Sequence, residues 1–189
     1  MKHIRLVVAL MIATFVIAGC QNTKNPKANA EVETSDNEQV ADNDSTVYGV
    51  EIAAAMHSLE MKGTDGKMYH FLKDMDDSAC VFGGLLDGDQ LAVTYRVEKN
   101  EIGADTIATK IINLTTLQAH WQSLDKDFEL LKGGEVKSHQ EGETRPWTSW
   151  RILNGHLLLN KDTFDITMLG PDSLFLEDKE GIYTYKRAK

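Results

Sequence analysis

Cysteine is scarce in this chain, with only Cys20 and Cys80 among 189 residues. Because Cys20 is expected to carry a modification, for reasons given below, Cys80 is left without an intrachain partner. The fold must then be stabilised by the burial of apolar side chains rather than by a disulfide. A folded part of roughly 140 residues is long enough for such a core, as one domain or as two very small ones.

Basic residues are also few. The chain has 20 Lys and Arg against 29 Asp and Glu, a formal charge of −9, and removal of Lys2 and Arg5 leaves 18 against 29, or −11. Clustered Lys and Arg side chains are what bind phosphate backbones and acidic membrane surfaces. The deficit therefore argues against nucleic acid as a partner, and against attachment to a bilayer by charge.

Residues 1–20 have the composition of a targeting segment. Lys2 and Arg5 precede an apolar run that is shorter than the roughly 20 residues of a transmembrane helix, which is the alternative explanation. The end of the run, Ile17-Ala18-Gly19-Cys20, resembles the lipobox of bacterial lipoproteins. This resemblance implies cleavage before Cys20 and acylation of its thiol, palmitate included. We therefore expect a lipid-anchored envelope protein.

Residues 21–47 contain no aromatic residue and six acidic ones. Such a segment buries too little surface to offset the entropy of ordering, so we expect a disordered acidic linker. Gln21 follows the cysteine and no acidic residue occurs before Glu31. This start resembles that of outer-membrane lipoproteins that face the periplasm.

After Tyr48 the sequence changes to short alternating runs broken by Gly and Asp, which is typical of antiparallel strands. Leu91, Val93, Tyr95 and Val97 share one face of such a strand, and the run Phe164, Ile166, Met168 repeats the pattern. The runs predict strands at 50–61, 67–73, 90–98, 105–113, 127–137, 147–153, 156–160, 162–169, 173–177 and 182–187.

The pair Asn154-Gly155 predicts a tight two-residue hairpin, because both central residues of a type I′ turn need positive φ. A two-residue loop fixes the register, so Trp150 pairs with Leu159 and Ile152 with Leu157. These four side chains then form one apolar face directed at a core.

We divide the folded part near residue 117, into residues 48–116 and 117–189. From Trp121 onward, the order of an early Trp, the Gly133-Gly134 turn, the Trp150–Leu159 hairpin and the terminal Tyr183-Thr184-Tyr185 resembles the lipocalin-like domains of lipid-anchored envelope proteins. That resemblance implies a meander or small barrel without a shared enzymatic activity.

Residues 56–113 more weakly resemble an OB-type barrel, through the runs 65–69, 88–95 and 108–113. The sequence therefore predicts an all-β fold with an OB-like first half and a lipocalin-like second half. An OB barrel joined to a lipocalin-like half is similar to an envelope-stress and copper-resistance lipoprotein family, but the paired-cysteine motifs of that family are missing here.

Soft metal ligands gather in the segment 56–80, where thioether, imidazole and thiolate groups are those that Cu(I) selects. The alternative is that Met residues fill a small β core and that Cys80 is simply buried. No tight ligand repeat fixes two of these groups together, so we expect no metal or cofactor, and a Cu(I)-responsive protein is the alternative function. The residues concerned are Met56, His57, Met61, Met68, His70, Met75 and Cys80.

An acidic run at 74–77, with Asp87 and Asp89 beyond it, offers oxygen ligands but lacks the Gly and Glu of an EF-hand loop. The sequence also contains no Gly-x-Ser-x-Gly nucleophile motif, so we expect no enzymatic activity. The remaining candidates are aromatic side chains that either line a pocket for an apolar or sugar ligand or complete a core. They are Trp121, Trp147, Tyr183 and Tyr185, with Arg151 beside them. The expected function is a binding module for a small ligand or an envelope partner.

Overall fold

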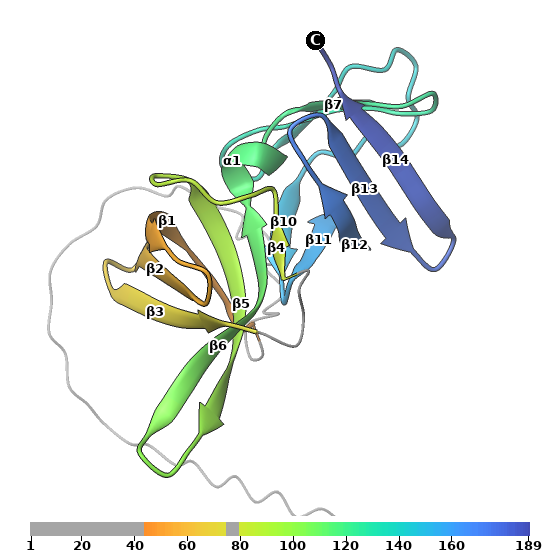
Figure 1. The fold of residues 1–189 in the computed structure, drawn as a ribbon. Coiled ribbons are helices and arrows are strands. Elements are labelled where there is room, and N and C mark those ends of the chain that lie inside the picture. The colour runs from red at the N-terminus through yellow and green to blue at the C-terminus, as the bar shows by residue number, and fades with distance from the viewer. Residues whose placement is uncertain (1–43, 75–79) are drawn as a thin grey trace, which may run out of the picture. The chain divides into compact units, whose positions relative to one another are not determined.

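The structure, a computed structural model, describes residues 44–74 and 80–189. Cys20 and nearly all of the expected linker lie outside the described residues, as do Met75, Asp76 and Asp77. The regular secondary structure of the described chain is almost entirely strand, and it forms two antiparallel-rich sheets that curl into barrels (Figure 1). The prediction of an all-β fold is confirmed.

The first barrel is closed by five strands, with a short sixth strand added outside the closure. β1 pairs with β2 and β5, β2 with β3, and β5 with β6, all antiparallel, while β3 and β6 close the barrel in parallel. This is the connectivity of an OB-type barrel. The strands are β1 (Thr46–Ala54), β2 (Ser58–Gly63), β3 (Met68–Lys73), β4 (Val81–Phe82), β5 (Gln90–Lys99) and β6 (Ala104–Asn113).

The second barrel is nearly closed and follows a short helix, α1 (Leu114–Leu117). Its sheet has the order β10-β11-β12-β13-β14-β7-β8-β9, and a bridge between Glu135 and Ser149 brings its two ends together. The strands are β7 (His120–Gln122), β8 (Asp127–Leu130), β9 (Val136–Ser138), β10 (Trp150–Leu153), β11 (His156–Leu159), β12 (Asp162–Leu169), β13 (Ser173–Asp178) and β14 (Gly181–Arg187).

Three of the predicted strands are wrong in extent, and one of them, 147–153, begins only at Trp150. The segment 50–61 is two strands, β1 and β2, joined by a turn at residues 55–57, and 127–137 is likewise divided into β8 and β9. The short elements α1, β4 and β7 were not predicted. β1 also begins at Thr46, inside the range expected for the linker.

Two alternation patterns are interrupted, one by a β-bulge and one by packing on both faces of a strand. A register shift between Ile166 and Met168 turns Met168 outward, where it is 47% exposed, and buries Leu169 in its place. A bulge inserts one extra residue and so moves the following side chains to the other face. On β5, Ala92 is as buried as Leu91 and Val93, because its face packs against the second barrel.

The predicted hairpin register is confirmed at all four positions, from Trp150 with Leu159 to Leu153 with His156. Ile152, Leu157 and Leu159 are at most 1% exposed. Burial of each such side chain contributes about 1.5–3 kcal/mol, which is an upper bound because unfolded chains are partly compact.

The larger hydrophobic core fills the second barrel and reaches the outer face of the first. Ala92 of β5 and Ile112 of β6 belong to the same buried cluster as Trp121 and Leu174 of the second barrel. A smaller cluster around Leu59, Met61 and Phe71 fills the first barrel alone. The two barrels therefore have separate sheets and separate interiors, and they are joined by an apolar interface between them.

Polar contacts join the barrels where β1 meets the β10–β11 hairpin. The Tyr48 hydroxyl donates to the Ile152 carbonyl at 2.5 Å and accepts from the Ile152 N–H at 3.1 Å. The Asn154 side chain accepts from the Ser45 N–H at 2.9 Å, and the Asn154 N–H donates to the Thr46 hydroxyl at 2.8 Å. The turn of the second barrel is thus held by the first strand of the first barrel.

Replacing Gly155 with Val tests this turn. Gly155 has φ +79°, and a Cβ there lies 2.9 Å from Lys110 Cδ, so a β-branched residue is strained in both backbone and packing. We expect a loss of about 1–3 kcal/mol, a melting temperature several degrees lower and a red-shifted tryptophan emission. Gly103→Val is the matched control, since nothing lies within 4 Å of its Cβ position. Unchanged melting and emission of Gly155→Val would contradict the tight turn.

Candidate functional site

The wall of the second barrel is incomplete between β14 and β7. These strands pair only through Lys186 with Gln122 and Arg187 with Trp121, at the end of β14, so the earlier part of β14 has no partner on that side. An open cleft of about 1790 Å³ lies here, between the loop 123–126, the start of β12 and the β13–β14 hairpin.

A continuous series of aromatic rings lies along the floor of the cleft and passes beneath it through the buried Phe128. Tyr185 contacts Phe128 edge-to-face at 5.1 Å between ring centroids, and Phe128 contacts Trp147 in the same way at 5.1 Å. Trp147 continues to Phe164 at 5.8 Å, and Phe164 to Tyr183 at 6.0 Å. Edge-to-face pairs of this kind stabilise a fixed arrangement of rings. The cleft therefore has a rigid aromatic floor, of which Trp147 and Tyr183 are only partly buried.

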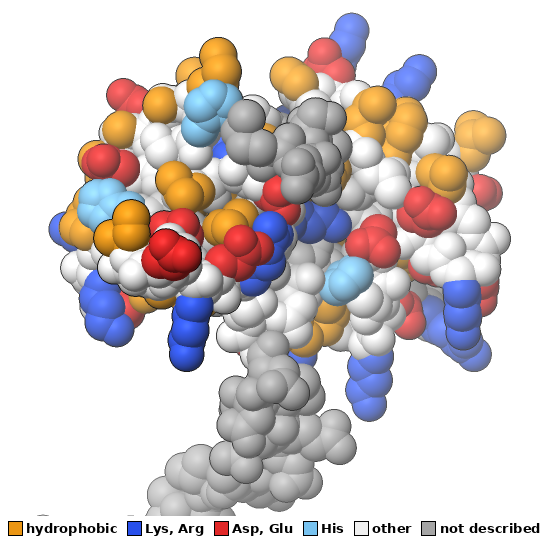
Figure 2. All heavy atoms as spheres, turned by 60° about the horizontal axis from the view of Figure 1, so that its bottom comes forward, with side chains coloured by type: hydrophobic (Ala, Val, Ile, Leu, Met, Phe, Trp, Pro, Cys, Tyr) orange, Lys and Arg blue, Asp and Glu red, His pale blue; other side chains and the backbone are white. Residues whose placement is uncertain are grey.

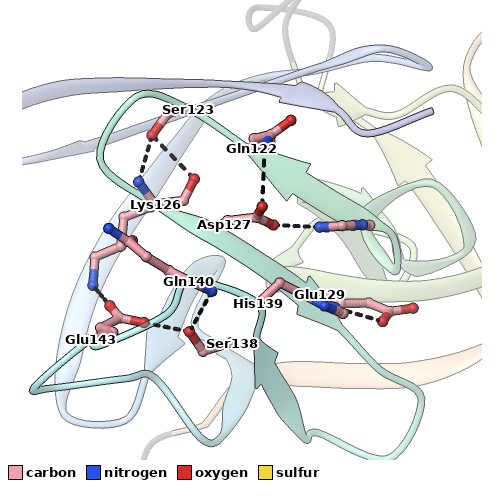
Figure 3. A network of polar contacts seen from close by, with 10 residues as sticks. Gln122, Ser123, Lys126, Asp127, Glu129, Ser138, His139, Gln140 and Glu143 are labelled. Atoms are coloured by element: carbon pink, nitrogen blue, oxygen red, sulfur yellow. Dashed lines mark hydrogen bonds and ion pairs between the residues drawn. The ribbon is translucent and has the colours of Figure 1, made fainter.

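A pair of charged residues holds Trp147 in place. Lys126 Nζ lies 4.5 Å from the centroid of the Trp147 ring and also forms an ion pair with Glu143. The Glu143 carboxylate accepts a second hydrogen bond, from the Ser138 hydroxyl at 2.5 Å, and Figure 3 shows this chain of contacts. Burial alone raises the pKa of Glu143, but the bonds from Lys126 and Ser138 outweigh it and leave the pKa below its ordinary value.

The two tyrosines of the floor stay protonated at neutral pH. Burial raises the pKa of Tyr185, and it also raises the pKa of Tyr183, to which the carboxylates of Asp178 and Glu180 add. Both phenols are therefore hydrogen-bonding groups rather than bases or nucleophiles under physiological conditions.

Three of the five residues predicted for a pocket are brought together at the cleft, namely Trp147, Tyr183 and Tyr185. Trp121 is fully buried, donates its indole N–H to the Leu117 carbonyl at 2.9 Å, and belongs to the core. Arg151 is exposed on the other face of β10, away from the cleft lining. The structure thus divides the predicted set between the cleft, the core and the surface.

Phe164 and Lys126 also line the cleft, and the buried Phe128 packs beneath it; none of the three was predicted for the site. The alternation on β12 already placed Phe164 on the face of Ile166, which was a usable signal for an inward position. Lys126 offered none, because a lysine in a polar loop is ordinary until the fold places it over a ring.

The soft-ligand segment is dispersed over the first barrel. Met61 is fully buried, whereas Met56 and Met68 are 82% and 49% exposed. Cys80 is 5% exposed, which confirms the expectation of a buried cysteine. In residues 44–74 and 80–189, no group of three or more His, Cys, Asp or Glu side chains is placed to hold a metal ion.

A second polar cluster lies on β7, β8 and β9. The rings of His120 and His139 stack at 4.3 Å, and each Nε2 is directed at its own carboxylate, His120 at Asp127 and His139 at Glu129 (Figure 3). Gln122 also donates to Asp127, at 3.1 Å. Each imidazole thus has a carboxylate partner within the cluster. These contacts connect the neighbouring strands β7, β8 and β9.

Comparisons of the chain with models of known families, with curated proteins and with solved structures return no match. Among the described residues, no helix has the length and apolar character needed to cross a membrane.

Glu51 is the one acidic side chain buried in the described part of the molecule. It is 2% exposed, and its Oε2 atom has no hydrogen-bond partner. Burial raises the pKa of Glu51, and the nearby charges of Asp89 and Asp87 raise it further. The folded state therefore favours the protonated carboxyl.

This shift predicts a pH-dependent stability. A carboxyl whose pKa is higher in the folded state stabilises the fold below its ordinary pKa of 4.5, and that contribution is lost as the pH rises through the raised value. Glu51→Gln should therefore be more stable than the wild type at neutral pH, with a difference that vanishes towards pH 4 in thermal melts. Glu101→Gln, at an exposed turn, should show no such trend. A pH-independent difference for Glu51→Gln would contradict the assignment.

Proposed function

We propose that this chain is a non-enzymatic, lipid-anchored envelope lipoprotein that binds a small ligand in the cleft of its second barrel. The observation that carries the proposal is the gap between β14 and β7, which leaves Trp147 and Tyr183 accessible above a rigid aromatic floor. Concave sites lined by aromatic side chains with a few fixed polar groups are typical of ligand pockets.

The chemistry of the cleft supports binding rather than catalysis. Lys126 and Glu143 neutralise each other, and the phenols of Tyr183 and Tyr185 have raised pKa values. Groups in these states donate and accept hydrogen bonds without activating a nucleophile or abstracting a proton. They orient a ligand.

In this proposal Cys20 carries acyl chains after cleavage of the preceding residues. Each buried methylene contributes about 0.8 kcal/mol, so several chains on one cysteine anchor the protein without a membrane-spanning segment. The acidic linker then holds the barrels away from the bilayer, and the start at Gln21 favours the periplasmic face of the outer membrane.

The three tryptophan indoles provide a direct test of the ligand site. Trp121 is 0% and Trp150 7% exposed, whereas Trp147 lines the cleft. We expect that polar or lipid small-molecule extracts of the envelope shift the indole N–H resonance of Trp147 in ¹⁵N-labelled protein and leave the other two unchanged. Trp147→Phe assigns the signal. If no extract moves the Trp147 resonance, or if Trp121 and Trp150 move equally, the cleft is not the ligand site.

A further inference from the structure

We infer that the ligand of the cleft is a neutral oligosaccharide that lies across the aromatic floor, rather than an acyl chain that enters the barrel. This inference rests on the proposed function, since it names the class of ligand for the same cleft. Three independent features of the second barrel support it: a filled interior, a balanced charge around the cleft, and aromatic rings beside hydrogen-bonding groups.

The interior below the aromatic floor is filled. Leu157, Leu159, Leu174 and Leu176 are 0% exposed, and Ile166 is 1% exposed. None of these side chains lines the cleft, which ends at the aromatic residues. Barrels that carry apolar ligands hold them in an interior cavity, and eight strands leave room for one only when side chains do not occupy it. A ligand must therefore lie over the floor.

The charged residues around the cleft cancel. Its lining contains five basic side chains and five acidic ones, although the whole chain has a formal charge of −9. They are Lys126, Arg145, Lys161, Lys179 and Lys186 with Asp125, Asp162, Asp172, Asp178 and Glu180. The face of the molecule shown in Figure 2 carries side chains of both signs. A balanced lining selects neither an anion nor a cation by its field.

Aromatic rings beside donors and acceptors suit a sugar. A pyranose ring presents C–H groups on its faces, which pack on aromatic side chains, and hydroxyl groups at its edge, which both donate and accept hydrogen bonds. Trp147 and Tyr183 supply the rings, and the carboxylates of Asp178 and Glu180 lie close enough to Tyr183 to raise its pKa. Apolar packing with polar contacts at the edge is the usual form of a specific small-ligand site.

The test uses the full chain with Cys20→Ala, in order to remove the lipid, and measures binding by the Trp147 indole resonance and by calorimetry. The probes are neutral hexasaccharides (maltohexaose, mannohexaose and chitohexaose), an acidic oligogalacturonate, and the apolar N-phenyl-1-naphthylamine. We expect at least one neutral hexasaccharide to bind and to shift Trp147, and the acidic and apolar probes to bind at least tenfold more weakly.

A pair of Tyr183 variants separates the contribution of the aromatic ring to sugar binding from that of the hydroxyl. Tyr183→Ala should weaken sugar binding tenfold or more, whereas Tyr183→Phe, which keeps the ring, should weaken it less. Arg151→Ala, away from the cleft, should bind as the wild type does. Thermal melting of each variant shows that it is folded.

The outcomes distinguish the inference from the proposal beneath it. If the apolar or acidic probe shifts Trp147 and the neutral sugars do not, the oligosaccharide inference is overturned while the binding function stands. If neither these probes nor the envelope extracts shift Trp147, both are overturned.

Discussion

The structure depends on how the open edge of β10 is covered. β10 is the last strand of the eight-stranded sheet, and an uncovered edge strand exposes backbone groups that pair with other chains. Along this edge the Trp150 N–H donates to the Gly134 carbonyl at 2.7 Å, and both backbone groups of Ile152 bond to the Tyr48 hydroxyl. The Asn154 N–H then donates to Thr46. The closure of the second barrel is thus completed by side chains of β1.

The wall of the second barrel therefore has two gaps, of which one is sealed and the other stays open. The gap between β9 and β10 is narrowed by the Glu135–Ser149 bridge and sealed by the first barrel. The gap between β14 and β7 keeps only two residue pairs and stays open over aromatic rings. The sealed gap fixes the positions of the three neighbouring strands β10, β11 and β12. Phe164, at the start of β12, is therefore held where it contacts Trp147 and Tyr183. The first barrel therefore supports the site without lining it.

Local signals in the sequence were sufficient to predict the features that depend on interactions between residues close in the chain. Asn154-Gly155 predicted its hairpin register because a two-residue loop leaves no choice of pairing. Long runs without a strong turn signal were less informative, so 50–61 was predicted as one strand although it bends at residues 55–57. Bulges such as that before Met168 are also hidden, since they arise from the pairing of two strands rather than from one.

The site was predicted only in part, for a related reason. Trp147, Tyr183 and Tyr185 were identified as aromatic candidates, but Trp121 belongs to the same residue type and is core. Composition does not show which ring faces a gap, because the gap exists only where β14 extends beyond β7. The contact of Lys126 with Trp147 joins two loops, and no local pattern marks it.

The Tyr48 hydroxyl seals the β10 edge and so couples the two barrels, and this role is open to measurement. Amide hydrogen exchange of Ile152 in the wild type and in Tyr48→Phe tests it most directly, with Tyr95→Phe as a control that removes a phenol hydroxyl elsewhere in the first barrel. For Tyr48→Phe alone we expect faster exchange in β10 and β11 and a loss of about 1–3 kcal/mol in unfolding free energy, because two backbone groups lose their partner. Unchanged exchange at Ile152 with unchanged stability would contradict it.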